Sequence, residues 1–366
     1  PMAPNNALRD KSEKEKEALA VKASESWGMV SADEVRDRGT GVHSLIDDFK
    51  SGPNSELRCY FTALMFITRL PCPGWCDHHP GYLMRSMAWF PLCGTFVGLW
   101  CAAFIDAAAA LVSPTLAAAA SMAASMWLTG CFHEDGLGDT TDGFGGGWTK
   151  SQILRIMKDS RIGTYGCVAL VLFTASKTLA LGELGPSVWV LCKCSGQGPA
   201  LVVAHTLARA TSAPLIYVCP YVVDAEDAKA DYYGWFGRSR ELLGPTRVIF
   251  AAMSATAVAV GVYGPSLQTL VLVSAVAAAT VFSGYYGTSV IGGVMGDYLG
   301  ATICLTELAL YSLLTVDVSR VLHLAQEQGW PTALRPFMVL AAVLAIPKLW
   351  SRGAAKISLE DKDKEC

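Results

Sequence analysis

The densest group of reactive side chains lies in segment 133–143, at the end of an apolar stretch. Asp135, Asp139 and Asp142 follow the spacing i, i+4, i+7, so a helix would place all three carboxylates on one face. Three neighbouring anions repel one another unless a cation neutralises them, and Mg²⁺ or Mn²⁺ prefers such an all-oxygen ligand set. The spacing therefore predicts a divalent-cation site with these aspartates as ligands; an exposed acidic loop is the alternative.

A second polar segment, 156–166, precedes the next apolar stretch and contains cations, an acid and glycines. Lys158 and Arg161 are candidate phosphate donors, and a helical turn would point both to one side. Gly163 would let the backbone approach a phosphate, and Asp159 is a further candidate ligand of the cation. The alternative interpretation is an ordinary positively charged helix end at a membrane surface.

Several ionisable residues lie inside or beside apolar segments: Lys177, His205, Arg209, Asp297 and Glu307. A charged group facing lipid costs about 3 kcal/mol on insertion scales, so these groups are expected to face a polar interior or one another. His205 lies four residues before Arg209, so on a helix the two share a face and can contribute to one phosphate site. A structural ion pair such as Arg209–Glu307 is the alternative.

The composition indicates which elements must position these residues. Lys plus Arg total 29 and Asp plus Glu total 32, and the charges concentrate in segments 1–60 and 352–366. Apolar residues make up 52 % of the chain and the mean hydropathy is +0.35, too apolar for a water-soluble globule. A net charge of −3 offers no electrostatic footprint for nucleic acid, so the lipid bilayer is expected as a partner and nucleic acid is not.

Long segments rich in Ala, Leu and Val predict an all-α, polytopic membrane protein with six to eight transmembrane helices. Breaks are expected at Ser113-Pro114 and at Gly264-Pro265, two spans are expected between residues 182 and 220, and 336–350 is the last candidate. The chain is thus divided into a charged, disordered extension, a membrane-embedded domain and a charged tail, over residues 1–57, 58–350 and 351–366.

The sequence resembles the cobalamin-5′-phosphate synthase family, also called adenosylcobinamide-GDP ribazoletransferase. The resemblance covers residues 58–350 and is carried chiefly by segments 133–143 and 156–166, which together are highly specific. Weaker support comes from segments 66–71, 90–98, 204–209 and 296–307.

The resemblance implies a membrane transferase of late vitamin B12 biosynthesis. The 3′-hydroxyl of α-ribazole, or of its 5′-phosphate, would attack the phosphoryl group attached to cobinamide in adenosylcobinamide-GDP, and GMP would leave. Such phosphoryl transfer requires charge neutralisation and positioning more than covalent help. The enzyme is expected in the inner or plasma membrane of a bacterium or in an organellar membrane of a eukaryote, and a homo-oligomer is left open.

The residues then take three sets of expected roles. The cation, Mg²⁺ or Mn²⁺, is assigned to Asp135, Asp139 and Asp142. The catalytic residues are Lys158 together with a general base, Asp159 or His205, between which the sequence does not choose. Substrate and phosphate binding is assigned to His133, Lys158, Arg161, Gly163, Arg209, Asp297 and Glu307.

Two other functions fit parts of the pattern. A CDP-alcohol phosphotransferase also clusters Asp and Gly at the end of a span, but its signature places an Arg in a register that has no counterpart after Gly143. A transporter would place its acids in the middle of spans and often repeat them in two halves. The acids here concentrate at a span end beside a basic segment, which favours the transferase.

Overall fold

The computed structural model describes residues 55–76, 80–222, 239–316, 323 and 326–328. The chain divides into two compact units, residues 1–315 and 316–366, and every element bounded below belongs to the first. The extension before residue 55, the candidate span 336–350 and the tail 351–366 lie outside the described residues.

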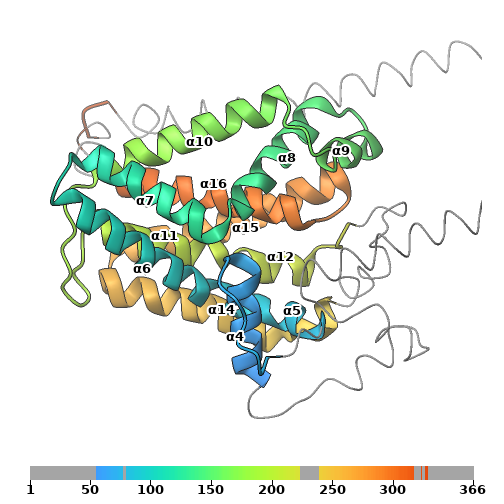
Figure 1. Cartoon of the computed structure of the whole chain (residues 1–366), viewed down its shortest axis with the longest axis horizontal. Helices are drawn as coiled ribbons and strands as arrows, with labels where there is room; N and C mark the ends of the chain where they lie inside the picture. Colours follow the sequence, from blue (N-terminus) through green and yellow to red (C-terminus); the bar gives the residue numbers. More distant parts are fainter. Residues whose placement is uncertain (1–54, 77–79, 223–238, 317–322, 324–325, 329–366) are drawn as a thin grey trace, which may run out of the picture. The chain divides into compact units, whose positions relative to one another are not determined.

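The described part of the first unit is built from helices (Figure 1). It contains two isolated β-bridges besides the helices, Val188 with Ser195 and Tyr221 with Val294. The elements in chain order are α4 (Ser55–Ile67), α5 (Pro80–Ser86), η1 (Met87–Trp89), α6 (Phe90–Ala109), α7 (Pro114–Thr129), α8 (Phe132–Gly146), α9 (Lys150–Met157), α10 (Thr164–Glu183), α11 (Gln197–Arg209), α12 (Ser212–Val218), α14 (Ser239–Tyr263), α15 (Leu267–Ile291) and α16 (Gly296–Leu314).

The described helices confirm the prediction of an all-α, multi-pass membrane protein. Five stretches are long and apolar enough to cross a bilayer, and α7 with α8 forms a sixth only as a broken span bent by 91°. The five stretches are Gly81–Ala109, Thr164–Glu183, Gln197–Val218, Arg240–Tyr263 and Leu267–Ile291.

The two expected breaks are present, and each has a local cause. Ser113 is the N-cap of α7, accepts a hydrogen bond from the backbone N–H of Leu116, and precedes Pro114, whose fixed φ suits the first turn of a helix. Gly264 separates α14 from α15 with φ of 72°, a left-handed conformation that residues with a side chain rarely adopt.

One expected span is absent. Residues 184–196 form a loop with an antiparallel bridge, so the segment between residues 182 and 220 contributes one span rather than two. Gly185 (φ 69°) and Pro186 stop α10 from continuing, because neither favours a helix interior. Asp106 then anchors the loop by accepting hydrogen bonds from Ser187 Oγ and, at 3.0 Å, from Trp189 Nε1.

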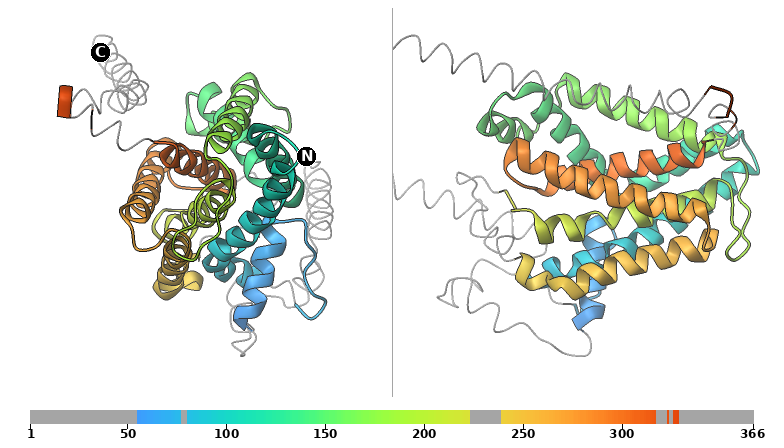
Figure 2. Two further views of the ribbon diagram at one scale, coloured as in Figure 1. Left: turned by 90° about the vertical axis from the view of Figure 1, so that its left-hand side faces the viewer. Right: turned by 180° about the vertical axis from the view of Figure 1, so that it is seen from behind.

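α9, before α10, and Val222, after α12, lie at one end of the bundle. Ile153 and Leu154 of α9 pack in one apolar cluster with Val222, the residue before segment 223–238, and with Ile291 at the end of α15. The loop 184–196 lies at the opposite end (Figures 1 and 2). Two spans, α10 and α11–α12, therefore connect two polar segments on the same side.

Small residues allow the central helices to pack closely, as the alanine- and glycine-rich segments indicate. A Cβ built on Gly94 of α6 would lie 2.3 Å from the carbonyl oxygen of His205, and one on Gly98 would lie 2.6 Å from Cα of Val202. Both glycines therefore set the distance between α6 and α11. This contact fixes the depth at which α11 presents His205 and Arg209 to the interior.

Candidate active site

The aspartates of segment 133–143 all lie on α8, as their spacing predicts. Asp135 is exposed, Asp139 is half-buried and Asp142 is buried. Asp135 and Asp142 both repel the carboxylate of Asp139 electrostatically, so the three lie near one another along the helix. α8 leads toward α9 (Figure 1), and His133 and Glu134 at its N-terminal end are buried.

A fourth carboxylate joins this group because α8 and α16 pack in close contact. A Cβ on Gly136 would lie 2.6 Å from the backbone oxygen of Asp297, and one on Gly300 would lie 3.3 Å from that of His133. This close approach brings Asp297, in the first turn of α16, near enough to repel Asp139. The acidic group therefore comprises Asp135, Asp139 and Asp297 with Asp142 behind them.

The donor set suits a hard divalent cation, because its members offer carboxylate oxygens and repel one another until a positive charge is added. Within the described ranges, however, no three His, Cys, Asp or Glu side chains converge tightly enough to form a metal site. The four carboxylates constitute an acidic group with the chemistry of a Mg²⁺ site, and Mg²⁺ binding by Asp135, Asp139 and Asp142 stays a prediction.

Asp142 differs from the other acids in its hydrogen bonds. Its Oδ2 accepts a hydrogen bond of 2.6 Å from the backbone N–H of Gly163, and its Oδ1 accepts one of 2.8 Å from that of Gly166. Both oxygens are therefore bound to the first turn of α10. The acidic and basic segments of the sequence are in direct contact through this side chain.

The basic segment does not form the helical turn expected for Lys158 and Arg161. α9 ends at Met157, Lys158 caps it, and residues 159–163 form an irregular connection to α10. In this connection Arg161 NH2 pairs with Asp159 Oδ2 at 2.6 Å, and the Arg161 Nε–H donates to Oδ1 at 3.0 Å. The helical turn that was expected to point Lys158 and Arg161 to one side is thus absent, and Arg161 pairs with Asp159.

The ion pair with Arg161 lies on the surface, with 86 % of the Arg161 side chain exposed. Hydrogen bonds from the Arg161 side chain and backbone lower the pKa of Asp159 to about 2. A carboxylate this acidic is a weak proton acceptor at neutral pH. Of the two candidate general bases, Asp159 is therefore the less suitable.

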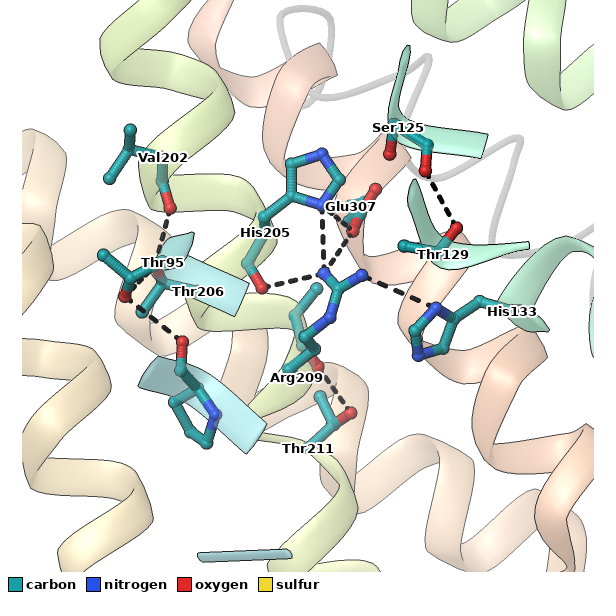
Figure 3. A network of polar contacts seen from close by, with 12 residues as sticks. Thr95, Ser125, Thr129, His133, Val202, His205, Thr206, Arg209, Thr211 and Glu307 are labelled. Carbon is teal, nitrogen blue, oxygen red and sulfur yellow. Dashed lines mark hydrogen bonds and ion pairs between the residues drawn. The ribbon is translucent and has the colours of Figure 1, made fainter. Parts of the chain in front are cut away.

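The charges embedded in apolar segments meet in one buried network, as expected (Figure 3). Glu307 is its centre: Oε2 accepts from Lys177 Nζ at 2.8 Å, and Oε1 lies 2.9 Å from Arg209 NH1 and 2.8 Å from His205 Nδ1. Arg209 NH2 also lies 3.5 Å from Nδ1 of His133. The network connects α8, α10, α11 and α16, so the expected Arg209–Glu307 ion pair is present within a larger group.

Two members of this buried network were not among the predicted site residues, Lys177 and Glu134. Glu134 is 9 % exposed, lies within electrostatic reach of Lys177, Arg209 and Glu307, and its Oε2 has no hydrogen-bond partner among the described residues. Two cations thus face two acids in the interior. A Lys and a Glu inside apolar segments indicate an ion pair, so Lys177 could have been found from the sequence. Nothing in the sequence indicates a buried role for Glu134, because it lies within the acidic segment 133–143.

The two halves of the site are continuous along α8. His133 and Glu134 contact the buried network, and Asp135 and Asp139 belong to the acidic group at the open end. The helix therefore joins a rigid, charge-paired interior to a charged end beside residues 158–163. Such an arrangement can hold a polyanionic substrate at the surface of the bundle while the interior fixes the helix that binds it.

The helices define a multi-pass integral membrane protein, in which an acidic group and a basic connection lie side by side. A family model for cobalamin-5-phosphate synthase matches residues 59–315, so the chain belongs to that family, whose members are transferases of cobalamin biosynthesis. The resemblance of segments 133–143 and 156–166 is thereby confirmed.

Three relatives are each called adenosylcobinamide-GDP ribazoletransferase. The protein of Leptothrix cholodnii is 39 % identical over 70 % of this chain and 94 % of its own length. Those of Shewanella pealeana and Shewanella piezotolerans are 38 % and 36 % identical, each over 71 % of this chain and 96 % of their own length. No solved structure matches the chain.

Proposed function

We propose that this protein joins adenosylcobinamide-GDP to α-ribazole, or to α-ribazole 5′-phosphate, and releases GMP. The observation that supports the proposal best is the direct contact between the acidic helix and the basic connection through Asp142. A pyrophosphate needs cations and donors on one side and a cation-binding group of carboxylates on the other. The acidic group on α8 and the connection that carries Lys158 and Arg161 are the two groups that meet here.

Phosphate binding and cation binding are assigned to different side chains. Lys158 and Arg161 lie on the connection before α10 and bind the phosphates of the leaving GMP. Asp135 and Asp139 face the same end and would hold Mg²⁺, with Asp297 adding negative charge from α16. Bound there, the cation would neutralise the charge that develops on the phosphoryl oxygens.

Of the two candidate bases His205 is preferred, and the attacking hydroxyl would have to reach it inside the bundle, because His205 is 1 % exposed. Its Nδ1 lies 2.8 Å from Glu307 Oε1 and 3.0 Å from the donor Arg209 NH1, and in the tautomer with the proton on Nδ1 the lone pair is left on Nε2. Nε2 has no hydrogen-bond partner in the described part of the chain. For His205 to act as the base, Glu307 would accept the proton on Nδ1, and Nε2 would be the atom that takes the proton of the attacking hydroxyl.

The direct test is a reconstitution. Purified protein in lipid nanodiscs receives Mg²⁺, adenosylcobinamide-GDP and α-ribazole or its 5′-phosphate, and the corrinoid product and GMP are measured. We expect both products in equal amounts and none without Mg²⁺. Turnover of a CDP-alcohol with release of CMP, and none of adenosylcobinamide-GDP, would establish the rival phosphotransferase function.

A conservative change at Arg161 tests its role in phosphate binding. Arg161→Lys keeps the charge but loses the planar pair of donors, so we expect kcat/KM for adenosylcobinamide-GDP to fall about 5- to 150-fold, with little change in KM for ribazole. The matched control is Arg155→Lys in α9. Wild-type kinetics for Arg161→Lys would show that the residue only supplies positive charge at the membrane surface.

The low pKa of Asp159 leads to an expectation for pH. Its pKa in the folded protein is depressed to about 2, so any stability it contributes is present above about pH 4 and is lost only as the pH falls toward 2. Asp159→Asn should therefore leave the acidic limb of the kcat/KM profile between pH 5 and 9 unchanged. A shift of that limb would identify Asp159 as the base after all.

A further inference from the structure

We propose that Asp142 is a positioning residue that fixes the phosphate-binding connection to α8, and that it does not bind the cation. This inference rests on the proposed function, since it names how the basic connection is held beside the acids. The side chain of Asp142 points toward the start of α10. Asp142 is 8 % exposed, and each of its carboxylate oxygens accepts a backbone hydrogen bond from α10.

The first turn of α10 needs an external partner. Its N-cap is Gly163, which has no side chain to accept a hydrogen bond from the backbone N–H groups of that turn. Asp142 satisfies two of these groups from another helix, and its negative charge lies at the positive end of the helix dipole. One carboxylate thus replaces the cap that the local sequence lacks.

The glycines of segment 156–166 fit this carboxylate closely. A Cβ on Gly163 would lie 2.4 Å from Asp142 Oδ1, and a Cβ on Gly166 would lie 2.4 Å from Oδ2 and 2.8 Å from the backbone oxygen of Gly138. Any side chain at either position would displace the carboxylate. Both glycines therefore serve the contact with Asp142, whose carboxylate fills the space in which a phosphate was expected to approach Gly163.

The consequence concerns the connection that carries Lys158 and Arg161. That connection is fixed at one end by the capped helix α9 and at the other by the contact between Asp142 and the start of α10. The distance from these cations to Asp135 and Asp139 is thus set through Asp142. A carboxylate with both oxygens bound to backbone amides is poorly available to a cation, which leaves cation binding to the remaining acids.

Two variants separate the two roles. Asp142→Asn replaces one acceptor by an NH2 group, which cannot accept from a second backbone N–H. Gly163→Ala removes no carboxylate from the protein, but its methyl group pushes the carboxylate of Asp142 away. The φ of −91° at Gly163 suits alanine. Gly261→Ala is the matched control, since a Cβ there meets no atom within 4 Å.

The measurements are Mg²⁺ affinity by calorimetry, hydrogen exchange of the amides of residues 163–166 without Mg²⁺, and kcat/KM. For positioning, we expect both variants to speed exchange at least 10-fold, to lower kcat/KM for adenosylcobinamide-GDP about 10- to 100-fold, and to keep Mg²⁺ affinity within about 3-fold of wild type. Gly261→Ala should change none of these values by more than about 2-fold.

The inference is overturned if Asp142→Asn weakens Mg²⁺ binding at least 10-fold, as Asp139→Asn should, while Gly163→Ala does not. It is also overturned if exchange at residues 163–166 is unchanged in both variants. Affinity and exchange are measured without substrate, so an inactive wild-type protein would contradict the proposed function and still allow this test. If Asp142→Asn does not fold, Gly163→Ala alone decides between the outcomes through its exchange rate.

Discussion

Replacing Glu307 by glutamine is expected to destabilise the protein by about 3–5 kcal/mol, because it removes the carboxylate shared by two buried cations. Lys177 and Arg209 are each 2 % exposed, and both donate to Glu307. Glutamine keeps the shape but not the charge, so both cations lose their direct partner in a region where water cannot replace it. Denaturation in mixed micelles measures the loss of unfolding free energy.

The appropriate control is Glu183→Gln, because Glu183 is an exposed residue at the end of α10. Its replacement should change stability by less than about 0.5 kcal/mol. A second test of charge balance adds Lys177→Met to Glu307→Gln. This double variant leaves Arg209 facing Glu134, one cation and one acid, so it should be more stable than Glu307→Gln alone. A double variant that is less stable than either single one would show that the network is not governed by charge pairing.

The residue types and spacings in the sequence predict the helical elements and several of the contacts between polar residues. The spacing of Asp135, Asp139 and Asp142 predicts one helical face, because helix geometry depends on local sequence alone. The rarity of charge in apolar segments likewise predicts that the charges there face a polar interior or one another, because a lone charge in lipid is costly, and Arg209 and Glu307 do face each other. Both inferences follow from energies too large for the tertiary fold to override.

What the sequence could not provide depends on contacts between distant segments. Asp142 accepts hydrogen bonds from Gly163 and Gly166, and Glu134 faces Lys177, in each case because two helices happen to pack together. The turn expected at Lys158 was also wrong, since α9 ends one residue earlier and its continuation is irregular. Such details follow from packing between α8, α10 and α16, for which no local pattern exists.

Replacing Asp139 by asparagine should lower turnover at least about 10²-fold and yet leave the protein as stable as before or more so. The loss in turnover is expected because a cation ligand contributes several kcal/mol to transition-state stabilisation. The stability is expected to hold because Asp139 is repelled by Asp135, Asp142 and Asp297, and the neutral amide removes that repulsion. If Asp139 were a purely structural acid, its replacement would lower the activity and the stability of the protein together.

Two measurements separate the expected loss of turnover from the expected gain or constancy of stability. They are the turnover of adenosylcobinamide-GDP and thermal unfolding with and without Mg²⁺. Mg²⁺ should raise the unfolding temperature of the wild-type protein, because a ligand that binds the folded state stabilises it, and should raise that of Asp139→Asn much less. Asp106→Asn, an aspartate at the opposite end of the bundle that holds the loop 184–196, provides the matched control and should keep turnover within about 3-fold. An Asp139→Asn protein with normal turnover, or one that unfolds several degrees earlier without Mg²⁺, would mean that the acidic group serves the fold and not the chemistry.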